Sequence, residues 1–139
     1  MDYLPIFLDL RGRKGLVVGG GDAAARKATL MLSAGAWVTA VSPEPLSDAF
    51  KDLIGTDRLI HLQAAFRPEH LDGADVVFAA SGDDALDQAV HDAARARHVP
   101  VNVVDRPGKC SFIMPSIIDR SPVMVAVSSG GEAPVLSRL

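Results

Sequence analysis

The sequence has a single cysteine, Cys110, so no disulfide can form within the chain and nothing indicates an oxidising compartment. Only 5% of the 139 residues are aromatic, and the net charge is −3. Nucleic-acid-binding proteins usually carry a basic face and stacking aromatics, so this composition disfavours a nucleic-acid partner. With 48% apolar and 22% charged residues, the composition is that of a folded domain.

Long hydrophobic runs are also missing. Segments such as Val76–Ala80 and Val123–Val127 are far shorter than the roughly 20 residues needed to cross a bilayer. The first residues lack the basic and apolar regions of a signal peptide. We therefore expect a cytoplasmic protein without a membrane partner.

Residues 1–105 alternate between strand and helix patterns. Short apolar runs ending at glycine, proline or polar residues predict strands, and the run at 75–80 predicts a central one. The predicted strands are 15–18, 37–41, 59–64, 75–80 and 101–104. The predicted helices are 22–34, 46–54 and a segment capped by Ser81 that continues to about Arg97. This alternation predicts an α/β fold with a Rossmann-type parallel sheet.

Residues 106–139 follow a different pattern. Strands are expected at 111–114 and 123–127, with a turn at 119–122, and no helix separates them. The start of a helix is expected at 133–139. Because this segment is too short to form a core alone, we expect a short C-terminal β/helical extension that packs on the sheet or on another chain.

The glycine cluster after the first predicted strand is the strongest motif. Val18-Gly19-Gly20-Gly21-Asp22-Ala23-Ala24 fits the pattern G-x-G-x-x-G/A between a strand and a helix. A glycine lets the backbone approach a pyrophosphate, and the helix N-terminus offers free N–H groups to that anion. A tight strand-to-helix turn without a ligand is the alternative. The context favours a dinucleotide site.

The end of the second predicted strand bears on cofactor choice. Glu44, which follows Pro43, is the acidic residue that could reach a ribose hydroxyl; a solvated turn glutamate is the alternative. No arginine stands there to receive a 2′-phosphate. We therefore expect NAD rather than NADP.

Asp105 follows the fifth predicted strand, where open α/β sheets bind ligands. It could act as a general base, or it could be a loop carboxylate paired with Arg106. Asn102 lies within the strand and can be a structural hydrogen-bonding residue.

The four histidines show no metal-ligand spacing with Cys110 or with one another, so we expect no resident metal site. The serine-glycine stretch at 128–131 can cradle a carboxylate or be a plain turn.

Several motifs together resemble the N-terminal module of siroheme synthases, from Met1 to Leu139 in unbroken order. They are Asp2-x-Leu4-Pro5-Ile6-Phe7, Val18-Gly19-Gly20-Gly21-Asp22, Arg26-Lys27-Ala28, Asn102-Val103-Val104-Asp105, Ser111-Phe112-Ile113-Met114-Pro115-Ser116, Met124-Val125-Ala126-Val127-Ser128-Ser129-Gly130-Gly131 and Pro134-Val135-Leu136. That combination is far more specific than the glycine fingerprint alone.

The resemblance implies a bifunctional enzyme. NAD-dependent oxidation of the tetrapyrrole precorrin-2 to sirohydrochlorin would be followed by insertion of Fe²⁺, a substrate, to give siroheme. It implies a homodimer, with residues 1–105 binding NAD and residues 106–139 serving dimerisation and the substrate cleft.

The resemblance also implies roles for individual residues. The family's essential aspartate falls on Asp105. Its dinucleotide contacts fall on the glycine turn and the second strand end: Gly19, Gly20, Gly21, Asp22, Ala23, Pro43 and Glu44. We assign the substrate to Asn102, Ser128, Ser129 and Gly130. The sequence departs from the family pattern in two places. Ala25 stands where many relatives have glutamate, and Arg106 and Lys109 add positive charge after Asp105.

By the family's standard the chain is short, since relatives continue into a helical segment and some carry a methyltransferase domain. Two other functions remain open from the residues. One is a non-catalytic, NAD-binding regulatory module, which would need only residues 1–105. The other is a different NAD oxidoreductase, although no histidine or Tyr-Lys catalytic pairing is recognisable.

Overall fold

The computed structural model describes residues 1–130 and divides the chain into two compact units. The larger unit is Leu8–Ser111. The smaller one combines Met1–Phe7 with the residues from Phe112 onward. The helix expected at 133–139 lies outside the described residues.

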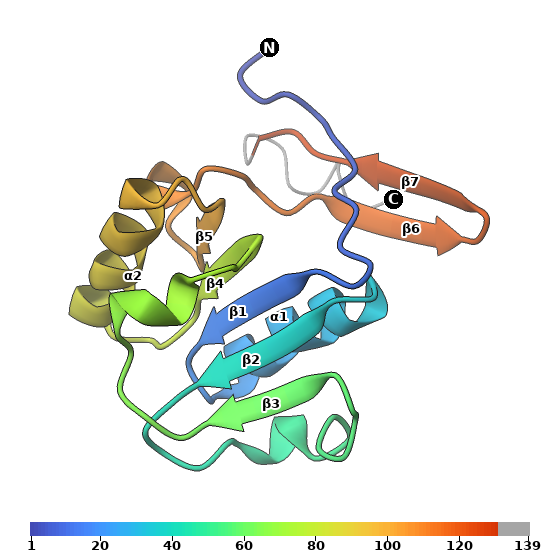
Figure 1. The fold of residues 1–139 in the computed structure, drawn as a ribbon. Coiled ribbons are helices and arrows are strands. Elements are labelled where there is room, and N and C mark those ends of the chain that lie inside the picture. The colour runs from blue at the N-terminus through green and yellow to red at the C-terminus, as the bar shows by residue number, and fades with distance from the viewer. Residues whose placement is uncertain (131–139) are drawn as a thin grey trace. The chain divides into compact units, whose positions relative to one another are not determined.

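The larger unit is built on a five-stranded parallel sheet (Figure 1). Its strands are β1 (Lys14–Val18), β2 (Trp37–Val41), β3 (Leu59–Leu62), β4 (Val76–Ala79) and β5 (Val101–Val103). They lie in the order β3-β2-β1-β4-β5. The predicted α/β fold with a Rossmann-type sheet is thereby confirmed. All four residues of β4 are buried between β1 and β5, as the uninterrupted apolar run predicted.

Two helices cover opposite faces of this sheet. Leu16 and Val18 of β1 belong to the hydrophobic cluster that includes Val90 of α2 (Asp84–Ala96). Gly15 lies on the opposite face of β1 from Leu16, because successive residues of a strand alternate between faces. A Cβ built on Gly15 would meet Met31 of α1 (Asp22–Ser33). Because the chain moves outward from β1 in one direction and from β4 in the other, right-handed crossovers place the two helices on different faces.

The helix predicted at 46–54 is wrong. The chain forms only a 3₁₀ turn, η1 (Asp48–Phe50), in which Phe50 N–H donates to the Ser47 carbonyl. Phe50 is fully buried, and η1 packs against α1. The one buried aromatic anchors the segment, which lacks the apolar stripe of a longer amphipathic helix.

Two further 3₁₀ turns, η2 (Pro68–Leu71) and η3 (Pro107–Lys109), were not predicted. The start of α2 also differs from the prediction. Asp83, not Ser81, is the N-cap residue, and its carboxylate accepts hydrogen bonds from the N–H groups of Ala85 and Leu86. A carboxylate at that position also gains from the helix dipole.

Within the smaller unit, β6 (Ser116–Arg120) and β7 (Val123–Val127) form an antiparallel hairpin. The strand at 123–127 and the turn at 119–122 are confirmed. The strand expected at 111–114 is wrong: none of these residues is in a strand, and Ser111 is bonded to β5 within the larger unit. The N–H of Ser111 donates to the Val101 carbonyl, and its hydroxyl accepts from the Val101 N–H. None of the helices in residues 1–130 is both long and apolar enough to span a membrane.

Candidate dinucleotide site

The direction of the chain across the sheet reverses between β1 and β4. From β1 the chain proceeds to β2 and β3 on one side, and then returns to β4 and β5 on the other. In open parallel sheets ligands bind outside the carboxyl ends of the strands at such a reversal. The glycine cluster and Asp105 both lie at this end, one after β1 and the other after β5.

Gly19 allows the turn after β1 to pack against the end of β4. Its φ is +134°, a region that L side chains rarely adopt, and a Cβ would collide with the Ala80 carbonyl oxygen. Its N–H donates to the Val41 carbonyl at the end of β2. This glycine therefore has a packing role whether or not a ligand is present.

Gly21 has a different environment. It is the N-cap residue of α1, and a Cβ there would meet no atom within 4 Å. A glycine cap has no side chain to accept from the first helical N–H groups, which are left for water or a ligand. A helix start with that geometry is suited to an anion.

The loop after β2 packs against the glycine turn. Ser47 N–H donates to the Gly20 carbonyl at 2.8 Å, and Ser47 Oγ donates to Asp22 at 3.0 Å. A Cβ on Gly20 would lie 2.9 Å from Ser42 Oγ. The structure thus brings the loop that carries Pro43 and Glu44, both exposed, beside the predicted pyrophosphate turn.

A pocket of ≈ 230 Å³ opens at the same end of the sheet. Its walls come from the N-terminus of α1, the β4–α2 loop and the turn after β5. The lining residues are Ala23, Ala80, Gly82, Asp84, Asp87, Val104, Asp105 and Arg106. Two predicted site residues, Ala23 and Asp105, therefore share one cavity although they lie far apart in the sequence.

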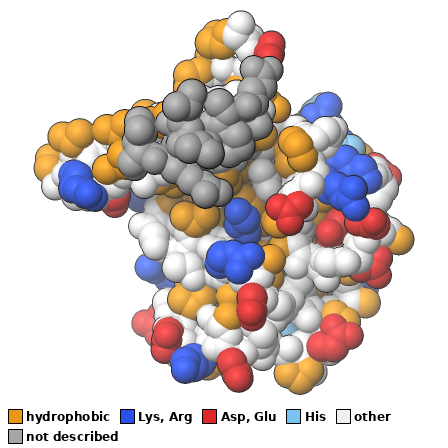
Figure 2. Space-filling model, turned by 180° about the vertical axis from the view of Figure 1, so that it is seen from behind, with side chains coloured by type: hydrophobic (Ala, Val, Ile, Leu, Met, Phe, Trp, Pro, Cys, Tyr) orange, Lys and Arg blue, Asp and Glu red, His pale blue; other side chains and the backbone are white. Residues whose placement is uncertain are grey.

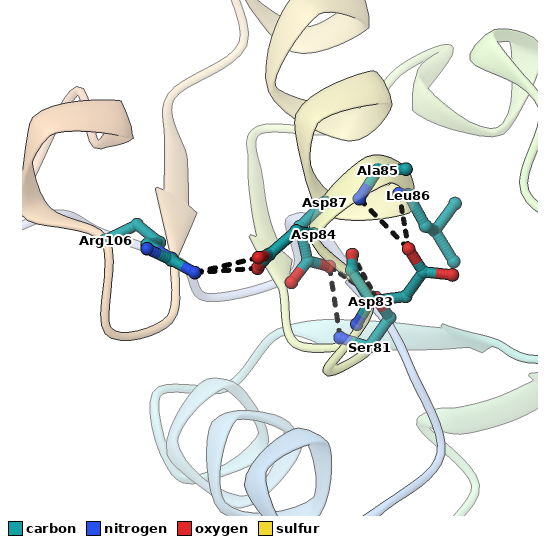
Figure 3. Close-up of polar contacts among 7 residues, drawn as sticks. All are labelled: Ser81, Asp83, Asp84, Ala85, Leu86, Asp87 and Arg106. Atoms are coloured by element: carbon teal, nitrogen blue, oxygen red, sulfur yellow. Dashed lines mark hydrogen bonds and ion pairs between the residues drawn. The ribbon is translucent and has the colours of Figure 1, made fainter.

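Asp105 is exposed at this pocket and has a left-handed backbone with φ +63°. Aspartate and asparagine tolerate that conformation better than most side chains. Arg106 does not pair with Asp105, which was one alternative reading of the sequence. Its guanidinium hydrogen-bonds to Asp84 at the start of α2 instead (Figure 3).

Sequence reasoning missed the β4–α2 loop as a pocket wall. The buried carboxylate of Asp87 accepts hydrogen bonds from Ser81 Oγ at 2.6 Å and Ser81 N–H at 3.2 Å (Figure 3). The sequence predicted a helix in this segment and no ligand site. That its acidic residues also form a pocket wall depends on β4 and β5 being neighbours, which the local sequence does not encode.

The predicted substrate residues fall in both units. Asn102 is buried in the middle of β5, in register with Phe78 of β4. Ser128 and Gly130 follow β7 in the smaller unit, where the Gly130 N–H donates to Ser128 Oγ at 3.1 Å. Gly130 has a left-handed φ of +70°. Ser129 lies between them.

Across residues 1–130, no three histidine, cysteine, aspartate or glutamate side chains are grouped so as to hold a metal ion. His61, for example, contacts the Ser42 carbonyl at 3.1 Å. Cys110 is half-buried, and burial raises the pKa of its thiol. Its sulfur also accepts from the Val103 N–H at 3.2 Å, a packing role within the turn after β5.

The open N-terminus of α1 and the glycine that permits close approach fit the phosphates of a dinucleotide. Together with the strand order and the pocket at the chain reversal, they define a dinucleotide-binding protein of the Rossmann class. A family model described as putative NAD(P)-binding matches residues 6–116. The chain belongs to this NAD(P)-binding family.

The chain is also similar along its full length to siroheme synthases. The chain is 60% identical over all 139 residues to the siroheme synthase of Thiobacillus denitrificans and 54% identical to that of Methylobacillus flagellatus. It spans 29% and 30% of those two proteins. The resemblance predicted from the motifs is confirmed along the full chain.

A solved structure has a similar fold. The protein titled "SirC, precorrin-2 dehydrogenase" superposes with a TM-score of 0.78 at 26% sequence identity. The match covers 98% of this chain and 66% of that one.

Proposed function

We propose that this chain catalyses the NAD-dependent oxidation of precorrin-2 to sirohydrochlorin and supports Fe²⁺ insertion to give siroheme. The observation that carries this proposal is the full-length match to siroheme synthases, in a chain whose pocket places Asp105 beside the dinucleotide turn. The similarity to a structure titled precorrin-2 dehydrogenase supports the same reaction.

The dinucleotide would be held by two neighbouring loops. Gly19, Gly20, Gly21, Asp22 and Ala23 would approach the pyrophosphate, and Pro43 and Glu44 would lie beside the adenosine ribose. Glu44 is an exposed carboxylate at the end of β2, which favours a ribose hydroxyl over a 2′-phosphate and hence NAD over NADP. When bound, NAD supplies the hydride acceptor.

Asp105 would serve as the proton acceptor. Oxidation of precorrin-2 releases a proton along with the hydride, and metal insertion displaces pyrrole protons as Fe²⁺ enters. An exposed carboxylate on the pocket wall can accept protons in both reactions. Asn102 and the segment Ser128–Ser129–Gly130 would contribute to tetrapyrrole binding.

The test is Asp105→Asn. Asparagine tolerates the same left-handed backbone, so the turn is kept while basicity is lost. We expect NAD affinity close to that of the unaltered chain, with oxidation and Fe²⁺ insertion both slower by about 10²-fold or more. The two reactions are followed by absorption spectroscopy, and NAD binding by calorimetry.

Asp57→Asn is the matched control, because Asp57 is an exposed loop carboxylate in the same unit, outside the pocket. Loss of oxidation alone would assign metal insertion to other groups. Unchanged rates in Asp105→Asn would refute its role as base. An unaltered chain that binds NAD but oxidises no precorrin-2 would favour the regulatory module instead.

We also propose a homodimer formed through the smaller unit, with the predicted segment 106–139 serving dimerisation and the substrate cleft. Ile117, Val123, Met124 and Val125 of the hairpin are each more than 40% exposed. A two-stranded sheet is marginal by itself, and no third strand within residues 1–130 pairs with it, so its edges can pair with another chain. Leu4, in the same unit, adds exposed apolar surface.

Sedimentation at micromolar concentrations tests the dimer. Val125→Glu should shift the chain to the monomer, because the glutamate would have to be buried in the interface. Ile60→Glu, on the exposed edge strand β3 of the larger unit, is the control and should leave the dimer intact. A monomer for the unaltered chain at high micromolar concentration would refute the proposal.

A cytoplasmic location is part of the same proposal. It is supported by the single cysteine of the sequence, which can form no disulfide within the chain.

A further inference from the structure

Lys27 is a half-buried cation beside the candidate site. It lies on α1 one turn after Ala23, which lines the pocket, so the two side chains share a face of the helix. Its ammonium lies 5.6 Å from the centre of the Phe78 ring on β4. Phe78 is almost completely buried, so the ring fixes where the lysine stem packs.

No carboxylate within residues 1–130 forms an ion pair with Lys27. Two other basic side chains of the larger unit illustrate the contrast: Lys14 donates to the His70 and Asp72 carbonyls, and Arg106 donates to Asp84. For Lys27 the contact within the described chain is the face of the ring, a cation–π attraction.

Burial lowers the pKa of Lys27, and the neighbouring Arg26 lowers it further. The charge of Asp105 acts in the opposite direction, which places that carboxylate within electrostatic reach. Because the ammonium has lost part of its hydration without gaining a close partner, an anion that reaches it gains more than it would at a fully hydrated lysine.

The surroundings of Lys27 suit an anionic group of a ligand, because the ammonium lies over a buried aromatic ring. Phe78 pairs in register with Asn102 of β5, so an aromatic ring and an amide stand side by side on neighbouring strands. Figure 2 views the side of the molecule on which α1 lies and shows basic side chains in the middle of this face, with carboxylates spaced around them. Asp105 stands at the end of β5, so a ligand anchored at Lys27 would extend toward the pocket.

We infer that Lys27 is an anchor for a carboxylate side chain of the tetrapyrrole, holding the macrocycle with one edge toward Asp105. This inference rests on the proposed function, because tetrapyrrole precursors of this kind carry ionised acetate and propionate groups. A phosphate of the dinucleotide is the other oxyanion that could reach the same ammonium. It is disfavoured because the open N–H groups that would bind phosphate lie one turn earlier, at the start of α1.

The experiment measures binding of sirohydrochlorin and of NAD separately, using the whole 139-residue chain. Lys27→Met keeps an unbranched apolar stem on the Phe78 ring and removes the charge. We expect sirohydrochlorin affinity to fall by about tenfold or more, as for loss of a charge-assisted hydrogen bond, with NAD affinity unchanged. Lys27→Arg should recover most of the affinity because it restores the cation.

Arg26→Met is the control, since Arg26 is the exposed neighbour and its loss changes the net charge equally. If Arg26→Met and Lys27→Met lower sirohydrochlorin affinity equally, the loss reflects only the change in net charge, and the inference is overturned. A loss confined to NAD would reassign Lys27 to the cofactor phosphate. Unchanged sirohydrochlorin affinity in Lys27→Met would overturn the anchor while leaving the proposed function standing. If the unaltered chain binds NAD but no tetrapyrrole, the proposed function fails, and the anchor with it.

Discussion

One guanidinium nitrogen of Arg106 lies between the two carboxylate oxygens of Asp84, at 2.9 Å and 3.0 Å. This contact joins the turn after β5 to the first residue of α2, and both residues line the pocket that contains Asp105. Arg106 also directly follows Asp105, whose backbone is left-handed. The ion pair therefore restrains the turn that presents the candidate base.

Breaking this pair should affect turnover more than stability. Both side chains are more than half exposed, so Asp84→Asn should cost less than about 1 kcal/mol of unfolding free energy. Because the turn carrying Asp105 would lose a restraint, we expect precorrin-2 oxidation to slow by about tenfold. Asp9→Asn, which breaks the exposed Asp9–Arg11 pair, is the control. An unchanged rate in Asp84→Asn would show that the turn holds its shape unaided.

Gly19 and Gly21 should respond differently to substitution. Gly19→Ala places a Cβ against the Ala80 carbonyl in a backbone region that suits glycine, so we expect a loss of about 2 kcal/mol or more. Urea unfolding measures it. A fully stable Gly19→Ala would contradict the packing of the turn against β4.

Gly21→Asp should leave the fold intact and abolish NAD binding. Aspartate is a good N-cap residue and the position is open, yet its carboxylate would occupy the place proposed for the pyrophosphate. Gly21→Asn separates charge from size and should weaken NAD binding less. Calorimetric titration that shows NAD binding by Gly21→Asp as strong as by the unaltered chain would refute the phosphate site at α1.

Asp87 should contribute to stability through the loop it braces. Its buried carboxylate accepts two hydrogen bonds from Ser81. Asp87→Ala leaves the Ser81 N–H without this acceptor and the Ser81 hydroxyl with the longer contact to the Asp83 carbonyl at 3.3 Å. We expect a cost of about 1–3 kcal/mol in urea unfolding. The double variant with Ser81→Ala should lose less than the sum of the two single changes. Strict additivity would show that the pair is not coupled.

Cys110 should react slowly in the folded chain. Burial raises the pKa of its thiol, so less thiolate forms near pH 8 than in an unfolded chain. The folded state therefore holds this proton more tightly, and the stability it contributes is lost as pH rises through the raised pKa. We expect thiol-reactive dye to label the folded chain at least about tenfold more slowly than the chain in urea. Equal labelling rates would contradict the burial of this thiol.

The sequence by itself determined the strands and helices whose signals are local. The apolar run ending at Gly19 and the β-branched residues before Val41 predicted β1 and β2, and the fingerprint at 19–24 predicted the dinucleotide turn. The resemblance to siroheme synthases also came from the sequence alone. It rests on which motifs are present and on their order along the chain, and both are properties of the sequence.

Only the tertiary structure decided which distant residues share a site. Asp84 and Arg106 meet because β4 and β5 are neighbours in the sheet, a pairing that depends on long-range hydrogen bonds. Segment 46–54 has local helical signals, yet burial of Phe50 limits it to a single 3₁₀ turn. From its position after a strand, Asp105 could be a general base or a loop carboxylate paired with Arg106. That it opens onto the same pocket as Ala23 follows from strand order, which is set by burial of both sheet faces rather than by any local pattern.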